Sequence, residues 1–247
     1  MKNGKKIAII LLMTIVVSCG IEDYLYLYPV PSGNITSESI SSATITLPSI
    51  DTQEFTHFTI YYRIYISASL QTGRIDEGIM STVNPSLDSD YRAFLPYTNT
   101  ETTISTSIGS LFSNRGYQTL VLEGVEIDDV LSKSSFGKTI ILDFIQTPGT
   151  MPALQDDTTW YNLRRSNGNG RFNPLPTDRY FLNDPALNAN DNASSTINAD
   201  VAKMSTTAEV RYTYVSMYIV VTGIDNNFSP IYSAPTFIGI LCLPEPY

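Results

Sequence analysis

The sequence of 247 residues predicts an all-β fold of the sandwich class. Several short runs are rich in β-branched and aromatic residues and carry an apolar side chain at every second position, as strands with one buried face do. The 16 tyrosines and the charged fraction of only 16% are typical of a β-rich chain and unlike the composition of a disordered one. Clusters of Pro, Gly, Asn and Asp separate the runs.

The strongest strand pattern is "FTIYYRIYIS" at residues 58–67. Alternate residues fall on two faces, an apolar one with Phe58, Ile60, Tyr62, Ile64 and Ile66 and a half-polar one with Thr59, Tyr61, Arg63 and Tyr65. Similar patterns predict strands at 43–47, 119–123, 139–145, 210–222 and 237–243. The apolar run at 215–224 has the length of a buried strand and is too short to span a membrane.

One helix is expected within residues 98–117. Ile104, Ile108, Leu111 and Phe112 recur there at helical spacing, and Gly116 is placed to end the helix. Serine and threonine, which are poor helix formers, fill much of the segment. From 148 to 199 the chain is rich in Pro, Gly, Asn and Asp, so we expect long loops there rather than a second core.

The N-terminus carries the pattern of an export signal. Three lysines, Lys2, Lys5 and Lys6, precede an apolar run over 7–17, which is shorter than the roughly 20 residues of a membrane-spanning helix. The sequence Val16-Val17-Ser18-Cys19 then resembles the lipobox of bacterial lipoproteins. The resemblance implies that a signal peptide over 1–18 is removed and that Cys19 receives diacylglycerol on its sulfur and an acyl chain on its nitrogen.

Three acyl chains on Cys19 would hold the protein on a membrane almost permanently, because two already give stable anchoring. The alternative is an ordinary secreted protein whose cysteine stands there by chance, but the A-x-A cleavage site of such proteins is missing. Gly20 follows the cysteine in place of the aspartate that marks inner-membrane retention in some bacteria. We therefore expect a lipid-anchored protein of the cell envelope, at the outer membrane or cell surface in preference to the inner membrane.

Removal of the signal would leave 229 residues, enough for one domain over 29–247 that a tether over 19–28 joins to the lipid. It would remove three lysines and no acidic residue, which changes the formal charge from −9 to −12. Such a charge repels phosphate backbones and anionic lipid heads, so we expect neither a nucleic-acid partner nor a polybasic membrane contact. Cys242, the other cysteine, is expected to be a buried strand residue.

The strands at both ends of the chain resemble those of a fibronectin type III domain. The segments "PVPSGNITSESISSATITL" and "FTIYYRIY" are similar to its strands A, B and C, and "YIVVTGIDNNFSPIYSAPTFIGIL" is similar to its strand F, F–G turn and strand G. The resemblance implies that F packs beside C. It also implies that the turn at Asp225-Asn226-Asn227, followed by Ser229-Pro230, reverses the chain into G.

The chain departs from this family in three respects. Pro48 stands where the family has a core tryptophan, Met217 stands near the place of the F-strand tyrosine, and more than a hundred residues separate the C-like and F-like strands. Two interpretations follow: an immunoglobulin- or fibronectin-like sandwich with a large insertion at about 68–209, or a different β-sandwich with similar edges. The first is our expectation, with loops and one short helix in the insertion.

Few residues predict catalysis, and no cofactor is expected. His57, the sole histidine, lies in no catalytic motif, and a turn or strand-edge position is expected for it. The pairs Asp128-Asp129 and Asp156-Asp157 offer the carboxylates of a glycoside hydrolase, yet neighbouring residues of an extended chain point to opposite faces, which favours solvated loop acids. An Asx-rich segment also offers oxygen ligands for calcium, from Asp184, Asn188, Asn190, Asp191 and Asn192. It lacks the spacing of an EF-hand, so a loop without metal is expected and calcium binding is the weaker alternative.

One cluster, "WYNLRRSNGNGRFNPLPTDRYF" at 160–181, predicts a ligand-binding site. Trp, Tyr and Arg dominate binding hot spots, and an exposed aromatic ring can also stack on a sugar. The candidate ligand-binding residues are Trp160, Tyr161, Arg164, Arg165 and Arg171, with Phe172, Arg179, Tyr180 and Phe181 close in sequence. The alternative is that these aromatics plug the edge of the sandwich while the arginines pair with acids such as Asp157 and Asp178.

These patterns together favour a membrane-anchored extracytoplasmic lipoprotein whose sandwich serves as a structural or binding module for protein or glycan. The lipid would supply location, and the loops would supply specificity. The alternative is a hydrolase of envelope polymers that uses loop carboxylates, for which a deep pocket and carboxylates of shifted pKa would be expected. A binding module would instead show a flat or shallow aromatic patch.

Overall fold

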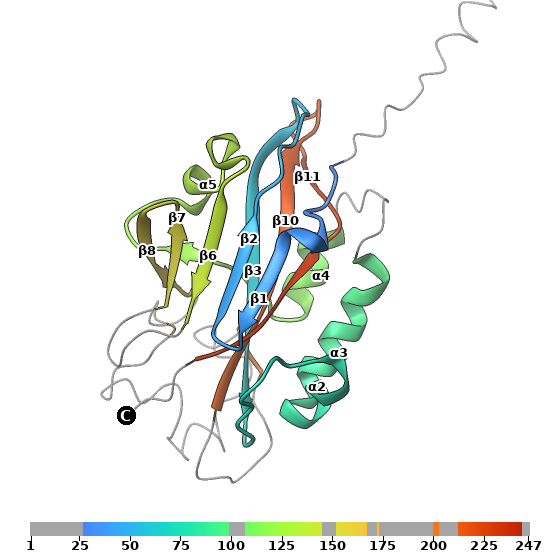
Figure 1. Cartoon of the computed structure of the whole chain (residues 1–247). Coiled ribbons are helices and arrows are strands. Elements are labelled where there is room, and N and C mark those ends of the chain that lie inside the picture. The colour runs from blue at the N-terminus through green and yellow to red at the C-terminus, as the bar shows by residue number, and fades with distance from the viewer. Residues whose placement is uncertain are drawn as a thin grey trace, which may run out of the picture.

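The computed structural model describes residues 27–98, 107–144, 152–166, 172, 200–202 and 212–243. Within these residues two largely antiparallel sheets stack face to face (Figure 1), which confirms the predicted all-β sandwich. The first sheet has the order β1-β2-β6-β7-β8-β5. The second has the order β11-β10-β3-β4, with β12 also paired to β10 and β9 to β3.

The strands have the following bounds. Those of the first sheet are β1 (Ile35–Ser39), β2 (Ser42–Thr46), β5 (Val121–Leu122), β6 (Thr139–Asp143), β7 (Ala153–Asp156) and β8 (Thr159–Arg164). Those of the second are β3 (Phe55–Ser67), β4 (Gln118–Thr119), β9 (Val201–Ala202), β10 (Tyr212–Ile224), β11 (Pro230–Tyr232) and β12 (Thr236–Cys242). The helices are α2 (Glu77–Val83), α3 (Pro85–Phe94), α4 (Ser107–Asn114) and α5 (Ile127–Val130), with short 3₁₀ turns η1 (Ser32–Asn34), η2 (Leu95–Tyr97) and η3 (Lys133–Ser135).

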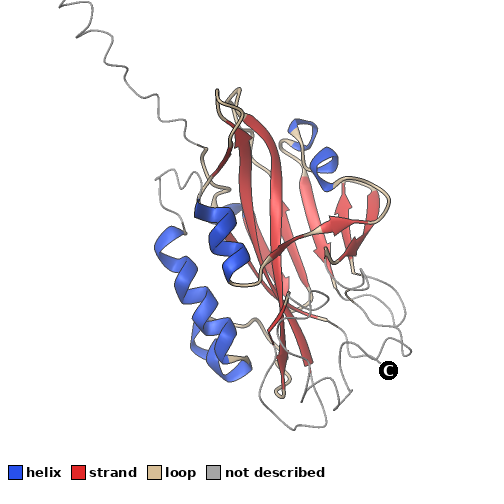
Figure 2. Ribbon diagram, turned by 180° about the vertical axis from the view of Figure 1, so that it is seen from behind, coloured by secondary structure: helices blue, strands red, loops and turns tan. Residues whose placement is uncertain are grey.

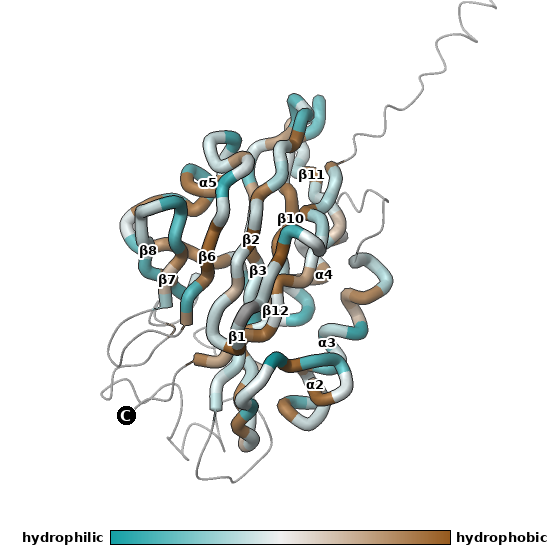
Figure 3. The backbone as a smooth tube through the Cα atoms, in the orientation of Figure 1, coloured by the Kyte–Doolittle hydropathy of each residue, from teal (hydrophilic) through white to brown (hydrophobic). Residues whose placement is uncertain are grey.

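Strands β3 and β10 form the centre of the second sheet. Their antiparallel register runs from Tyr212 opposite Ser67 to Gly223 opposite Phe55. One face of the pair enters the main core, as the period-two pattern predicts, with Phe58, Ile60, Tyr62 and Ile64 from β3 and Val215, Met217, Ile219 and Val221 from β10. Figure 3 shows hydrophobic segments along β10 and along β6 of the facing sheet.

The half-polar face of β3 is not exposed, because a layer of short helices covers it (Figure 2). Tyr61 stacks on Phe112 of α4 with 4.1 Å between the ring centroids, and Tyr65 packs with residues of α2 and α3. Helix α4 lies within the segment predicted to be helical, and Gly116 follows it at φ 73°, which also confirms the expected end. Ile104 lies outside the described residues.

The sequence prediction missed helices α2 and α3. Asn84 begins α3 with a side chain that accepts a hydrogen bond from Ser86 N (2.8 Å), and Pro85 occupies the first helical position. Met80, Val83 and Leu87 are buried against the sheet. The fold is therefore a sandwich with a third, helical layer where one short helix had been expected.

The expectation of loops from 148 to 199 is wrong for β7 and β8. These strands pair with Asp156 opposite Thr159, so that two residues, Asp157 and Thr158, form the turn, and Asp157 has φ 51°. Asp is one of the few residues that adopt this conformation readily. The expected strand at 119–123 is likewise divided, because β4 joins the second sheet and β5 joins the first.

The strands from both ends of the chain are divided between the two sheets. Here β1, β2 and β6 are neighbours in the first sheet, while β3 pairs with β10 and β10 pairs with β11 and β12. Strand β6, and with it β7 and β8, comes from the segment expected as an insertion at about 68–209.

The turn from β10 into β11 has the predicted position. The Asp225 side chain accepts hydrogen bonds from Asn227 N (2.8 Å) and Ser229 N (2.7 Å), and Phe228 adopts φ 62° at the tip. Cys242 lies half-buried at the end of β12, where full burial had been expected. At the other end of the chain, Leu27 is buried in the core although it belongs to the segment expected as a tether.

Candidate functional site

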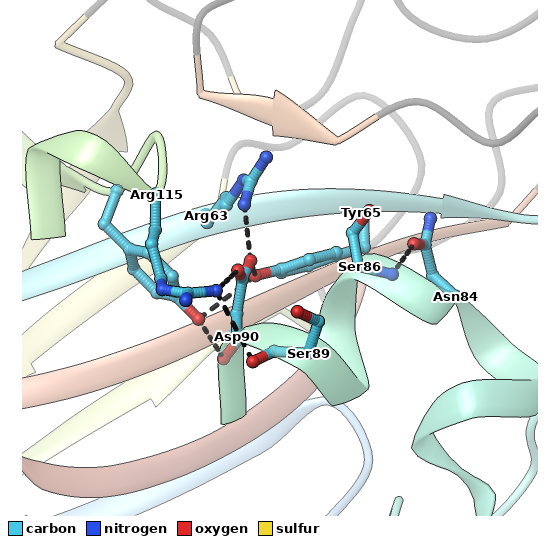
Figure 4. A network of polar contacts seen from close by, with 9 residues as sticks. Arg63, Tyr65, Asn84, Ser86, Ser89, Asp90 and Arg115 are labelled. Carbon is cyan, nitrogen blue, oxygen red and sulfur yellow. Dashed lines mark hydrogen bonds and ion pairs between the residues drawn. The ribbon is translucent and has the colours of Figure 1, made fainter. Parts of the chain in front are cut away.

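Two ionic clusters of the described residues lie in the interior. In the first, the buried Asp90 of α3 accepts hydrogen bonds from Arg63, from Arg115 Nη1 (3.0 Å) and from the Tyr65 hydroxyl (2.5 Å), as Figure 4 shows. Burial raises the pKa of the Tyr65 phenol, so this group stays neutral and donates a hydrogen bond to the carboxylate. The cluster, which we call the Asp90 network, joins the helical layer to β3.

The Asp90 network also extends into the sheet. The Tyr65 hydroxyl lies 3.1 Å from the Tyr117 hydroxyl, which donates to Ser216 Oγ at 3.0 Å. Burial raises the pKa of Tyr117 as well. Asp90, Tyr65, Tyr117 and Ser216 are buried and bonded to one another or to the two arginines, so the network explains how the helices are held on the sheet.

In the second cluster, Arg165 forms a two-pronged ion pair with Asp200. Arg165 Nε lies 2.7 Å from Asp200 Oδ2, and a second bond joins the Nη2 and Oδ1 atoms. The Tyr62 hydroxyl donates to the same Asp200 oxygen at 2.8 Å. All three side chains are buried, so the cluster fastens the chain after β8 and the chain before β9 to the centre of β3.

The remaining titratable candidates are paired in separate places. His57, which lies within β3, has Nε2 3.4 Å from Asp128 Oδ1, and burial lowers its pKa more than Asp128 raises it. Lys138 Nζ lies 3.3 Å from Asp156 and 3.4 Å from Asp157. The described residues include no group of three or more His, Cys, Asp or Glu side chains that could hold a metal ion. The Asx-rich segment from Asp184 to Asn192 lies outside them.

The exposed candidate is the outer face of β8. Strand alternation places Tyr161 and Leu163 toward the core, next to Leu154, and places Trp160, Asn162 and Arg164 on the opposite side. Trp160 is 49% exposed and lies directly across from Gln155 of β7. The register continues from Gln155 to Ile141 and from Ile141 to Thr44, so these side chains form one row across the sheet.

Glu123 completes this face beside β5. Its carboxylate accepts a hydrogen bond from Asn162 Nδ2 at 2.8 Å and forms an ion pair with Arg164. The Gln155 amide is held by a bond from Nε2 to the carbonyl of Asp157 at 2.8 Å. We call the five side chains Gln155, Trp160, Asn162, Arg164 and Glu123 the β8 outer face. They combine one open aromatic ring with amide, carboxylate and guanidinium groups in fixed positions.

The predicted ligand-binding residues are thus divided between surface and interior. Trp160 and Arg164 belong to the β8 outer face, and Tyr161 packs on the core. Arg165 is buried in its ion pair with Asp200. Arg171, Arg179, Tyr180 and Phe181 lie outside the described residues. Phe172 is buried, with its ring centroid 4.9 Å from that of Tyr62. Gln155, Asn162 and Glu123 were not foreseen as part of a site.

Comparison with known proteins identifies no relative. No protein-family model, no curated protein and no solved structure matches this chain. Among the described residues no helix has the length and apolar character required to cross a membrane.

The Asp90 network predicts a large loss of stability on removal of one charge. The Asp90→Asn variant keeps the shape of the side chain but leaves Arg63 and Arg115 without their carboxylate. Breaking a buried ion pair in this way is expected to lower the free energy of unfolding by about 3 kcal/mol, measured by urea denaturation followed by circular dichroism.

Asp88→Asn is the matched control on the same helix. Asp88 pairs with Arg92 on the surface, and the loss of such a pair is expected to cost about 0.5 kcal/mol. Equal denaturation midpoints for the two variants would show that the Asp90 network does not hold the helical layer.

Proposed function

We propose that this protein is a lipid-anchored binding module of the bacterial cell envelope, with a fibronectin type III-like sandwich whose ligand contacts the β8 outer face. The observation that carries the proposal is the exposed ring of Trp160 among the hydrogen-bonded polar side chains of the β8 outer face. A tryptophan that serves stability is packed in the core. An exposed ring beside hydrogen-bonding groups is instead the arrangement of a binding surface.

The character of the β8 outer face favours a glycan over a protein. Its single aromatic ring can stack on the apolar face of a sugar, and its amide, carboxylate and guanidinium groups can bond to hydroxyls. A protein interface would call for a cluster of apolar anchors at its centre, whereas the other four side chains of the β8 outer face are polar or charged. The formal charge of −9 further favours a neutral ligand over an anionic one.

The export signal and the lipobox at Val16–Cys19 support the envelope location. A triacylated Cys19 would keep the β8 outer face in the cell envelope, outside the cytoplasm, where envelope glycans are present. The Glu123 pairs with Asn162 and Arg164 hold the donors in place before any ligand arrives, which reduces the entropy lost on binding.

The anchor is tested by mass spectrometry of the protein purified from membranes of a bacterium that processes lipoproteins. We expect a chain that starts at Cys19 and carries diacylglycerol and one further acyl chain. The Cys19→Ser variant should keep its leader and gain no lipid. An unmodified Cys19, or a wild-type chain with the leader attached, would refute the anchoring.

The ligand site is tested through the fluorescence of Trp160, the only tryptophan of the chain. Titration with soluble polysaccharides from bacterial envelopes is expected to shift or quench this emission, because a sugar stacked on the ring removes it from water. Affinity electrophoresis in the same polysaccharides should show that Trp160→Ala loses about 2 kcal/mol of binding free energy, roughly 30-fold in Kd.

Leu70→Ala is the matched control for the ligand site, since Leu70 has the same exposed fraction of 49% and lies away from β8. It is expected to bind as the wild type does. If Trp160→Ala binds every retained polysaccharide as tightly as Leu70→Ala, the glycan site is not on the β8 outer face. If only proteins bind there, the module recognises protein.

A further inference from the structure

The end of the sandwich where β10 turns into β11 carries exposed apolar side chains without any role in the β8 outer face. Phe228, at the tip of the turn, is 89% exposed. Ile224 is 43% exposed at the end of β10, and Tyr28 is 62% exposed near the first described residue. We call Tyr28, Ile224 and Phe228 the apolar tip.

The backbone at Phe228 gives a second, independent observation. Phe228 adopts φ 62°, a left-handed conformation that is a real outlier for a bulky side chain and that glycine or asparagine adopts more readily. The ring makes little contact with the rest of the protein, so folding does not account for phenylalanine at this position. Strained residues that packing does not explain point to function.

The apolar tip lies beside the point where the N-terminal segment enters the body. Figure 1 shows the described chain beginning close to β11 and to the turn that precedes it. The close approach is confirmed at Gly223, where a Cβ atom would lie 3.0 Å from Leu27 Cδ1 and 2.5 Å from the carbonyl oxygen of Glu54. Ile224 is the next residue after Gly223, and Tyr28 is the next residue after Leu27, so the two exposed side chains belong to the same end of the sandwich.

The length of the intervening chain limits how far this end can lie from an anchor at Cys19. Eight residue steps join Cys19 to Leu27, and a fully extended chain covers at most about 3.6 Å per step, so the separation is below about 29 Å. The opposite end of β3, beyond Ser67, lies about 40 Å further along the strand of 13 residues. A short tether alone still lets the body rotate about its anchor.

We infer that the apolar tip inserts into the lipid surface beside the anchor and fixes the orientation of the sandwich on the membrane. This inference rests on the proposed lipid attachment at Cys19. Tyrosine favours the interface between acyl chains and headgroups, and phenylalanine is buried at this boundary by segments that lie on membranes. Neither contact requires an anionic lipid. The Asp225 carboxylate in the same turn accepts hydrogen bonds from two backbone N–H groups. These bonds lower the free-energy cost of bringing its charge close to a membrane.

The test uses the mature lipidated chain in phosphatidylcholine vesicles, with acylation confirmed by mass spectrometry. In a Trp160→Phe background, Phe228→Trp places the only tryptophan at the tip, and Leu70→Trp places it beyond the far end of β3. Phosphatidylcholine with brominated acyl chains quenches tryptophans that reach the lipid. We expect the Phe228→Trp emission to be quenched at least about twofold and the Leu70→Trp emission to remain unquenched.

Equal quenching of the two variants in a fully acylated protein would overturn the inference and leave the proposed anchor intact. A protein without acyl chains would overturn both. Phe228→Ser in the lipidated protein gives a second measure that needs no new tryptophan. A tryptophan from Leu70→Trp in that variant should become measurably quenched as the body loses its orientation, and an unchanged emission would also count against the inference.

Discussion

The pairing of β3 with β10 is the constraint on which the rest of the structure depends. Both strands have 13 residues and are buried on two faces, which is unusual for an antiparallel pair, since such sheets commonly leave one face in water. One face of the pair packs against the first sheet in the main core, and helices α2, α3 and α4 cover the other face. Because the described residues cover both faces of the pair, most of its side chains are not open to a ligand.

The location of the β8 outer face follows from this arrangement. The second sheet is covered on both sides, whereas the outer side of the first sheet faces solvent, and Trp160 stands there on a strand near its edge. The buried pair of Arg165 and Asp200 fastens the end of β8 to Tyr62 of β3. The exposed ring is therefore carried by a strand that the centre of the fold holds in place, as a preorganised site requires.

Much of the central fold could be predicted because alternation along a strand is a local property. The two faces of residues 58–67 and the turn at Asp225 follow directly from residue order. Helices α2 and α3 also left signals, with Asn84-Pro85 at a helix start and Met80, Val83 and Leu87 at helical spacing. That helices cover the half-polar face of β3 could not be predicted, because Asp90 comes into contact with Arg63 and Tyr65 only in the folded chain.

The candidate site was half predictable for a similar reason. Once β8 is known to be a strand, the alternation of side chains along it places Trp160 and Arg164 on one face and Tyr161 on the other. Arg165 follows the strand and turns inward, since Asp200, 35 residues later in sequence, satisfies its guanidinium. No local pattern contains such a pairing, and the same holds for Glu123, which follows β5 directly and bonds to Asn162 and Arg164.

The most direct test of this account is native-state amide hydrogen exchange. If the β3–β10 pair holds the remaining layers, the amides of residues 60–64 and 215–219 exchange only through global unfolding. The amides of β7 and β8 exchange through smaller openings and at least about tenfold faster. Protection of β7 and β8 that equals or exceeds that of β3 and β10 would contradict the account.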